Sequence, residues 1–410
     1  MPVVNQNTSE SLPDTFFPDQ SFYDACYDGD LDQVEKSLAE GVNVNAVTHD
    51  DFTALMMASD GGQKAIVESL IKAGANLNAT STGGATAMLF AAQENNIDCL
   101  ELLINAGANL NAAFSNGATP LLIAAKKGNT GCVKLLINAG ACLNAALSDG
   151  ATPLFFAAQE NNTDCLKLLI NTGADVNART ENGITPLFIA ALKGNTDSVK
   201  ALTEANADLN AKTKNGTTAL LIAALKNNIE SLKILIEAGA NLNVARTSDS
   251  STPLFIAIQE NNTDCLKLLI NAGVDLNTPR AKDGATPLLI AVWKGNADCV
   301  EILINGGADL NAVRAKDSVT PLFIAAWKGH TDCVETLIHV GADLNAAASD
   351  GTTPLYIAAK ENNIDCVNLL INAGADLNAT RITDGATPLS IATAMGNTDC
   401  MEALIKAGAK

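Results

Sequence analysis

The sequence predicts an all-α array of short stacked repeats, and three observations support this fold class. A Thr opens a T-[PA]-[LM] motif every 33 or 34 residues along most of the 410-residue chain. The segment QENNTDCLKLLIN occurs twice without a change, at 159–171 and 259–271, three motif steps apart. Each step also contains Gly or Asn at two fixed positions, and both residue types readily adopt φ > 0 and end helices. A regular period of this length is typical of repeat proteins.

The segment before the repeats has a different composition. Residues 1–20 are polar, contain Pro2, Pro13 and Pro18, and are expected to form a disordered tail. A repeat domain is expected over 21–410, and its first repeat, Ser21–Asp50, lacks the Thr-Pro opening but keeps the second half of the pattern. About twelve repeats are expected, starting near residues 21, 51, 84, 117, 150, 183, 216, 251, 284, 318, 351 and 385.

Gly150–Asn182 illustrates the elements of one repeat. Thr152 followed by Pro153 predicts the N-cap and first residue of a short helix, because proline's missing N–H costs nothing in the first turn. Thr163 and Asp164 are expected to cap a second helix, whose apolar residues recur at helical spacing. The polar stretch that follows is expected to be an extended finger loop. Neither helix reaches the ~12–15 residues needed for independent stability, so each must pack on its neighbours.

Two sets of positions are expected to end the helices. The first helices are expected to end at Gly62, Asn95, Gly128, Asn161, Gly194, Asn227, Asn261, Gly295, Gly329, Asn362 and Gly396. The second helices are expected to end at Gly74, Gly107, Gly140, Gly173, Asn206, Gly239, Gly273, Gly307, Gly341, Gly374 and Gly408. Because every member is Gly or Asn, each repeat contains two predicted helix ends.

These motifs resemble ankyrin repeats. GATPLFFAA at 150–158 and GADVNA at 173–178 match the G-x-T-P-L-H-x-A and G-A-D-V-N-A hallmarks closely, and the pattern covers about 21–410. The resemblance implies a curved all-α solenoid in which the first helices and fingers form the concave face, and the first repeat is similar to the family's N-terminal capping repeat.

One departure from the family pattern is systematic. The family's His after T-P-L, which hydrogen-bonds within and between repeats, is absent here. The replacements are Met56, Leu89, Leu122, Phe155, Phe188, Leu221, Phe255, Leu289, Phe323, Tyr356 and Ser390. This position is therefore expected to contribute packing.

Composition excludes several functional classes. A net charge of −19 and a pI near 4.5 argue against general binding to nucleic acids or anionic membranes, which requires clustered cations. The chain does not open with a basic and apolar signal segment, and no stretch approaches the ~20 apolar residues of a spanning helix. We therefore expect a cytoplasmic protein that does not insert into membranes.

Eight of the ten cysteines share one offset in the repeat. Equivalent atoms in stacked helix layers lie about 10 Å apart, beyond the ~7 Å between Cα atoms that a disulfide allows. The eight are Cys99, Cys132, Cys165, Cys265, Cys299, Cys333, Cys366 and Cys400, with Ser198 and Ser231 in the gaps. We expect a row of small buried thiols in a reducing compartment. Cys142 takes the Asp or Asn place in GACLNA and is expected to be an exposed thiol.

The sequence contains no candidate residues for catalysis or for metal binding. His49, His330 and His339 lie in no metal or nucleophile motif, and the Asp residues recur at fixed offsets as caps and finger residues. No phosphate-binding loop, dinucleotide turn or kinase signature occurs. We expect no enzyme activity, no cofactor and no bound metal.

An Asn recurs in the fingers. Its members are Asn78, Asn111, Asn144, Asn177, Asn210, Asn243, Asn277, Asn311, Asn345 and Asn378. Each is expected to lock its turn through a bond from the side chain to the backbone. The resemblance also implies that such an Asn can be hydroxylated, which the sequence leaves open.

Two sets of residues are candidates for partner binding because they vary between repeats. All five arginines lie in fingers, four of them in 34-residue repeats, and two lysines follow in the same fingers. This basic row consists of Arg179, Arg246, Arg280, Lys282, Arg314, Lys316 and Arg381. The only tryptophans, Trp293 and Trp327, occupy one offset in successive repeats, where core packing does not require Trp. Trp and Arg are enriched at interface hot spots.

The sequence favours a monomeric, non-enzymatic scaffold or adaptor that binds a protein partner on the concave face and fingers. Repeats around 245–345 are interpreted as the docking face for an acidic or amphipathic segment, with the arginines as charge contacts and the tryptophans as anchors. The alternative is that each arginine only offsets a nearby Asp and that the indoles cover Lys stems. A secreted bacterial effector of host proteins fits the same residues. A mechanical array without a dedicated partner is a further alternative, because the repeats are nearly identical.

Overall fold

The computed structural model describes residues 20–314 and 316–410. The expected disordered tail, residues 1–20, therefore lies outside the described residues apart from Gln20, which begins the first helix. The chain divides into two compact halves, 1–207 and 208–410, and each half is described by itself.

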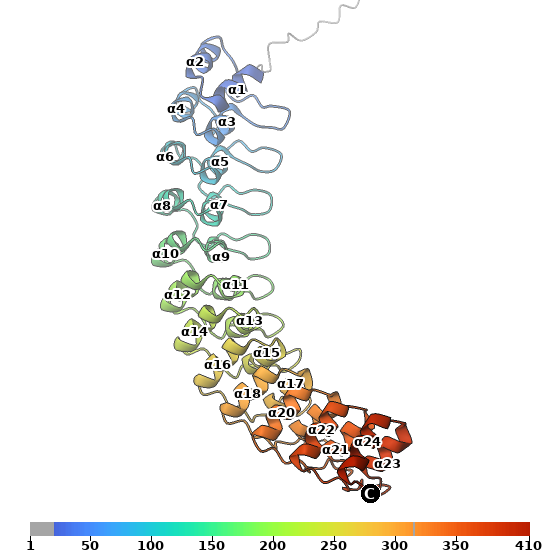
Figure 1. Ribbon diagram of the computed structural model, residues 1–410. Helices are drawn as coiled ribbons and strands as arrows, with labels where there is room; N and C mark the ends of the chain where they lie inside the picture. The colour runs from blue at the N-terminus through green and yellow to red at the C-terminus, as the bar shows by residue number, and fades with distance from the viewer. Residues whose placement is uncertain (1–19, 315) are drawn as a thin grey trace, which may run out of the picture. The chain divides into compact units, whose positions relative to one another are not determined.

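The N-terminal half is a two-layer stack of helix pairs (Figure 1). Successive first helices pack on one another and form one layer, and successive second helices form the other. The first helices are α1 (Gln20–Asp28), α3 (Ala54–Asp60), α5 (Ala87–Gln93), α7 (Pro120–Lys127), α9 (Pro153–Gln159) and α11 (Pro186–Lys193). The second helices are α2 (Leu31–Ala39), α4 (Lys64–Lys72), α6 (Ile97–Asn105), α8 (Thr130–Asn138), α10 (Thr163–Asn171) and α12 (Thr196–Glu204).

The C-terminal half repeats this arrangement. Its first helices are α13 (Ala219–Leu225), α15 (Pro253–Gln259), α17 (Pro287–Lys294), α19 (Pro321–Lys328), α21 (Pro354–Lys360) and α23 (Pro388–Met395). Its second helices are α14 (Ile229–Glu237), α16 (Thr263–Asn271), α18 (Ala297–Asn305), α20 (Thr331–His339), α22 (Ile364–Ala373) and α24 (Thr398–Ala407). The described residues contain no strand, only an isolated bridge between Val47 and Thr53. The fold is all-α, as the repeat pattern predicts.

A Thr is the N-cap of each first helix from α3 onward. Its hydroxyl accepts the backbone N–H three residues later in every case except Thr252, as Thr152 does from Phe155 at 3.3 Å. The apolar face that follows is buried, and Leu154 and Ala157 of α9 are 0% exposed. Since each helix is short, this face gains its stability from the adjacent helices.

All predicted helix ends adopt a left-handed backbone. Asn161, at the end of α9, has φ of 58°, and Gly173, after α10, has φ of 96°. Every other member of the two predicted sets also has positive φ, including Asn206 at 58°. The prediction of two helix ends in each repeat is therefore confirmed.

The start of the second helix differs from the expectation. The N-cap of α10 is Asn162, without a side-chain cap, and Thr163 is already helical. Asn162 instead donates its side-chain amide to the carbonyls of Ala125 and Lys126 in the preceding repeat, at 2.9 Å each. The prediction that Thr163 caps this helix is wrong because the residue before it is committed to the neighbouring repeat, while Asp164 does lie in the first turn. Equivalent bonds recur through each half, and we call them the amide brackets.

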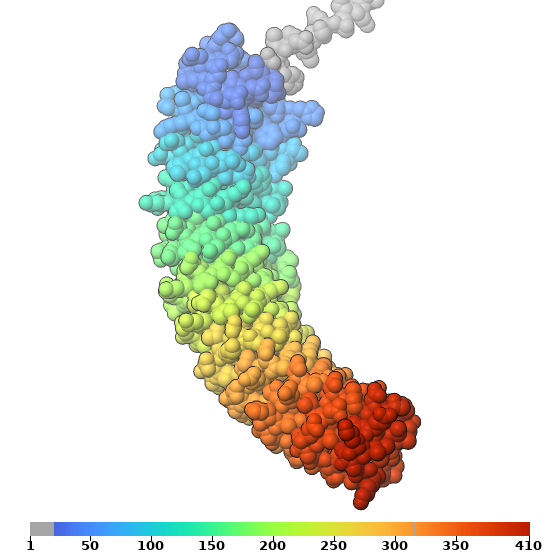
Figure 2. Space-filling view, in the orientation of Figure 1, coloured from blue at the N-terminus to red at the C-terminus, as the bar shows by residue number. Residues whose placement is uncertain are grey.

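The fingers are shaped by two hydrogen bonds. Asn109 accepts the backbone N–H of Asn111 at 3.0 Å and so closes its own turn. Asn111 reaches forward and accepts the N–H of Cys142, in the next finger, at 2.9 Å. The recurring Asn thus bonds to backbone as predicted, but it links two repeats, because the residue two positions earlier already closes the turn. The fingers of the first repeats project from the N-terminal half in the space-filling view (Figure 2).

The thiol row is buried as predicted. Nine of the ten free cysteines are buried, and Cys142 is exposed. Where the preceding first helix ends in Asn, the thiol or hydroxyl contacts that Asn, as Ser198 donates to Asn161 Oδ1 at 3.0 Å and Cys265 to Asn227 Oδ1 at 3.3 Å. Burial raises the pKa of Cys265 to about 11. These thiols are therefore protonated and unreactive at neutral pH.

Candidate functional site: the finger face of the C-terminal half

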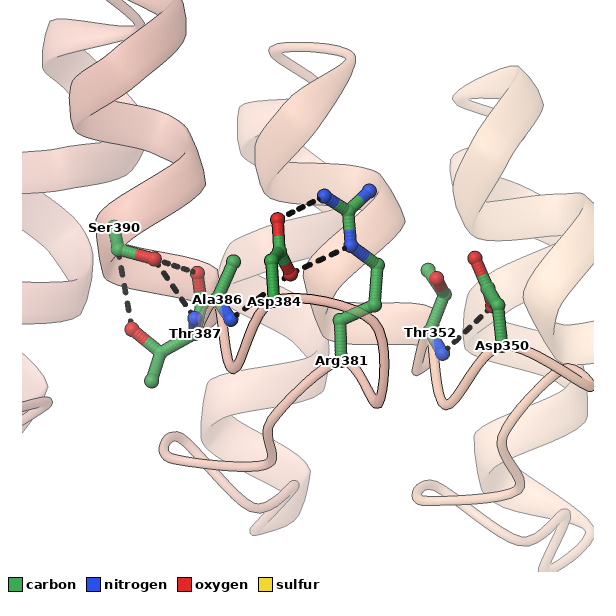
Figure 3. A network of polar contacts seen from close by, with 7 residues as sticks. All are labelled: Asp350, Thr352, Arg381, Asp384, Ala386, Thr387 and Ser390. Carbon is green, nitrogen blue, oxygen red and sulfur yellow. Dashed lines mark hydrogen bonds and ion pairs between the residues drawn. The ribbon is translucent and has the colours of Figure 1, made fainter.

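Four fingers of the C-terminal half contain an internal ion pair. In each, Nε and Nη2 of an Arg donate to the two carboxylate oxygens of an Asp three residues later, as Figure 3 shows for Arg381 and Asp384. In the finger before α15 the two distances are 3.0 and 2.5 Å. The pairs, which we call the Arg–Asp clips, are Arg246–Asp249, Arg280–Asp283, Arg314–Asp317 and Arg381–Asp384.

The clips occur where the finger carries one extra residue. In a 33-residue repeat the turn closes from Leu147 to Gly150, three residues on, whereas in a 34-residue repeat it closes from Arg280 to Gly284, four residues on. The residue whose N–H donates the closing bond has positive φ in both lengths, 88° at Gly150 and 68° at Gly284, so the additional residue lies inside the turn. The clip therefore holds a wider turn closed, which gives each of these four arginines a structural role within its own finger.

Electrostatics favour the charged form of every clip. The hydrogen bonds from Arg246 hold the pKa of Asp249 far below its usual range. The bonds from Arg280 and Arg314 likewise lower the pKa of Asp283 and Asp317, and those from Arg381 lower the pKa of Asp384 to about 2. The carboxylates are consequently ionised at neutral pH and neutralise the arginines locally.

Two clips also cover an aromatic ring. The guanidinium of Arg280 lies 5.7 Å from the ring centre of Phe255, and that of Arg381 lies 5.4 Å from the ring centre of Tyr356. Phe255 and Tyr356 follow the T-P-L motif and are 3% and 1% exposed. The expectation that this position packs is confirmed, except in the last repeat, where Ser390 is exposed and bonds back to Thr387.

The two tryptophans form one cluster with a lysine. Trp293 is the second-to-last residue of α17, and Trp327 is the second-to-last residue of α19. Their ring centres lie 5.5 Å apart, and the ring planes meet edge to face at 76°. The ammonium of Lys328 lies 3.9 Å from the centre of Trp293 and 5.0 Å from that of Trp327. Trp293 remains 39% exposed. A cation held over two indoles is fixed in position more firmly than a free lysine.

Each tryptophan lines a hollow between neighbouring fingers. The first hollow, of about 290 Å³, is bounded by Arg280, Asp283, Trp293 and Arg314, with Leu289 at its wall. The second hollow, of about 410 Å³, is lined by residues of α19, α21 and three fingers. Its lining includes Arg314, Trp327, Asp350, Tyr356 and Arg381. Both hollows lie on the side of the stack that carries the fingers, which we call the finger face.

The finger face carries local positive charge in two repeats. The segment 280–294 contains Arg280, Lys282 and Lys294 against Asp283, a net charge of +2, and 314–328 has the same charge pattern. The second helices of these repeats carry the opposite sign, since α18 and α20 each hold two carboxylates and no Lys or Arg. In a chain of net charge −19, this separation distinguishes the two faces.

Four lysines account for this uncompensated charge. Lys282, Lys294, Lys316 and Lys328 are exposed and form no ion pair with a carboxylate of the described chain. We call these four residues the basic strip. The two finger lysines were candidates from the sequence, whereas Lys294 and Lys328 were not, although each follows a Trp in a W-K-G motif.

The structure brings together most of the sequence candidates. Arg280, Arg314 and Arg381 line the two hollows together with Trp293 and Trp327, whereas Arg246 lies in the finger before α15 and lines neither hollow. Arg179 belongs to a finger of the N-terminal half, residues 1–207. The four clips agree with the alternative interpretation of the sequence, in which each arginine offsets a nearby Asp, and the R-x-x-D spacing in all four fingers identifies which Asp it is.

The described residues show neither a metal site nor a membrane-spanning helix. The described residues contain no group of three or more His, Cys, Asp or Glu side chains placed to hold a metal ion. No helix in the described part of the chain has the length and apolar character needed to cross a bilayer.

Comparison with known proteins identifies a family over nearly the whole chain. A family model described as ankyrin repeats in three copies matches residues 22–114, 109–180, 177–246, 243–314 and 322–410. A second model, ankyrin repeats in many copies, matches residues 298–338. No curated protein matches the chain.

Proposed function

Because the chain belongs to the ankyrin-repeat family, whose repeats are generally protein–protein interaction modules, we propose that it is a non-enzymatic recognition scaffold. Its docking face is the finger face of the C-terminal half, and its ligand is an acidic, amphipathic segment of a protein partner. The observation that carries this proposal is the pair of exposed or half-exposed indoles between two segments of net charge +2, in a chain of net charge −19.

The residues of the face have separate roles in this proposal. The basic strip supplies the charge that selects carboxylates, because its ammonium groups form no ion pair with a carboxylate of the described chain. Trp293 and Trp327 supply apolar anchors at the hollows, where a partner's side chains exclude water. The Arg–Asp clips of Arg246, Arg280, Arg314 and Arg381 are neutral as pairs, so they shape the fingers and present flat guanidinium surfaces. This assignment moves the charge contacts from the arginines to Lys282, Lys294, Lys316 and Lys328.

Selection from a random peptide library tests the proposal. The full-length chain is immobilised, a phage-displayed dodecapeptide library is panned against it, and the recovered peptides are synthesised for fluorescence anisotropy. We expect peptides rich in Asp and Glu with interspersed aromatic or aliphatic residues. The double substitution Trp293→Ala and Trp327→Ala should weaken their binding by ~10-fold or more, the effect typical of a central hot spot.

Two matched controls use the same two repeats. Glu301→Gln with Glu335→Gln changes charge on the second helices, and this variant should bind the peptides as the wild type does. Recovery of basic or neutral peptides, or equal binding by the double Trp variant, would contradict the proposed face. Recovery of no binding sequence at all would favour a mechanical array without a partner.

A further inference from the structure

The first residues of the chain have the chemistry that the finger face is proposed to recognise. Residues 10–19, ESLPDTFFPD, contain Glu10, Asp14 and Asp19 and no cation, so their net charge is −3. Leu12 and the adjacent pair Phe16 and Phe17 place apolar side chains among these carboxylates. No other segment in the first twenty residues combines charge and aromatic residues in this way.

The basic strip contains one lysine that is held ready for a carboxylate. Lys328 lies over both indoles, at 3.9 and 5.0 Å from their ring centres, and no described carboxylate pairs with it. A side chain already fixed in place loses less conformational entropy on binding than a free lysine. Lys294 occupies the same offset after its own Trp but has no ring contact in the described chain, so it carries equal charge without this restraint.

From this complementarity we propose that residues 10–19 of a second copy of the chain bind the finger face of residues 280–328. The inference rests on the proposed docking face and names one of its ligands. The carboxylates of the segment pair with the basic strip, Lys328 foremost, and Phe16 and Phe17 pack at the Trp293–Trp327 cluster. The contact joins the N-terminal segment of one copy to the finger face of another, so it is heterologous.

Long-range repulsion does not forbid this contact. Two copies each carry a net charge of −19 and repel one another at low ionic strength. At physiological ionic strength the screening length is ~8 Å, so contacts between local charges outweigh the total charge. The association is therefore weak, and a partner with a longer acidic segment displaces it. The segment would then compete with partners for the same face.

A synthetic peptide tests the inference directly. Residues 1–19, labelled with fluorescein, are titrated with the full-length chain, and binding is followed by anisotropy. We expect saturable binding that weakens at least 5-fold in Lys328→Gln and less than 2-fold in the charge-matched control Lys294→Gln. A peptide with Phe16→Ala and Phe17→Ala should also bind at least 5-fold more weakly, and this arm does not depend on the folding of any variant.

Sedimentation velocity on the whole chain provides the second arm. The weight-average mass of the wild type should rise with concentration, and Glu10→Gln with Asp14→Asn should reduce that rise. Absence of peptide binding, or equal losses in Lys328→Gln and Lys294→Gln, overturns the inference. The library selection is independent of this result: if it yields acidic peptides that need Trp293 and Trp327 while the 1–19 peptide does not bind, the docking face stands and the self-recognition falls.

Discussion

Ser198 and Ser231 occupy the position of the buried cysteines and should respond oppositely to substitution by Ala. Ser198 is 0% exposed and donates its hydroxyl to Asn161 Oδ1 at 3.0 Å. Ser231 is 1% exposed, and its hydroxyl has no hydrogen-bond partner among the described residues. The preceding repeat has Gly194 where the repeat before Ser198 has Asn161, so the sequence provides no side-chain carbonyl there.

The expected magnitudes follow from these two environments. Ser198→Ala removes one satisfied hydrogen bond and should cost about 1 kcal/mol of local stability. Ser231→Ala removes a buried, unpaired hydroxyl and should gain about 1 kcal/mol, because the penalty for burying that group disappears. The two variants therefore differ by ~2 kcal/mol, or ~30-fold in a local opening constant. Ser231→Cys, which restores the residue of the other repeats, should also stabilise.

Hydrogen exchange measured by mass spectrometry is the appropriate assay, because a long repeat array need not unfold in one step. Protection of the amides of α12 should fall in Ser198→Ala, and protection of α14 should rise in Ser231→Ala. Ser231→Ala and Ser231→Cys also serve as controls for each other, since both remove the hydroxyl with different volumes. Loss of protection in both Ala variants would refute the reasoning, because it would mean that the Ser231 hydroxyl is satisfied.

Two further predictions concern titrating groups. Burial raises the pKa of Cys132 and Cys299 to about 11, so a thiol reagent at pH 8 should rapidly modify one thiol per native chain, that of the exposed Cys142. Cys142→Ser should abolish this rapid phase of modification. Rapid modification of several thiols would contradict the burial of the other cysteines. The clip aspartates have lowered folded pKa values, so their stabilisation is present above the unfolded value of ~4 and is lost as pH falls through the folded values, about 2 for Asp384. The urea midpoint of Asp384→Asn should therefore lie below that of the wild type at pH 7 and approach it below pH 3, whereas a gap independent of pH would rule out the clip as its cause.

The helix ends were predictable because the backbone restricts which residues fit them. A left-handed φ is available to Gly and Asn at low cost, so a Gly or Asn that recurs at a fixed offset, such as Asn161 or Gly173, indicates a helix end from the sequence alone. The caps of the first helices were predictable for a similar reason, since Thr followed by Pro suits few other places. These local rules repeat in register, and the fold class follows from them.

The contacts between repeats were less predictable. Asn162 precedes a helix, where Asn normally caps, and its sequence neighbours do not indicate that its amide bonds to Ala125 and Lys126. Such a bond joins residues about 37 positions apart, so it depends on the packing of two helices and not on local preference. An Asn before a helix can therefore either cap that helix or bond to the preceding repeat, and the packing of the two repeats determines which of these it does.

The candidate face was partly predictable for the same reason. Trp293 and Trp327 stood out because their offset holds other residue types elsewhere. The pairing of Arg280 with Asp283 required the wider turn of a 34-residue repeat, which the count of residues alone does not describe. Lys294 and Lys328 share the motif W-K-G, yet only Lys328 lies over the indoles. Identical motifs in a repeat protein can thus differ in contacts because their neighbours differ.

The amide brackets bear on how the number of repeats in such a protein can change during evolution. Each bracket joins a side chain of one repeat to carbonyls of the one before it, as Asn129 does to Ala92 and Gln93 and as Asn397 does to Ala359 and Lys360. At most junctions within each half an Asn supplies the donor and the preceding repeat supplies the carbonyls, while Gln63 and His330 take the place of Asn at two of them. Recombination that deletes or duplicates a whole repeat with an Asn bracket therefore leaves a new junction with the same kind of bond as the old. Alleles of different length are then expected to fold alike while presenting different spans of finger face to a partner.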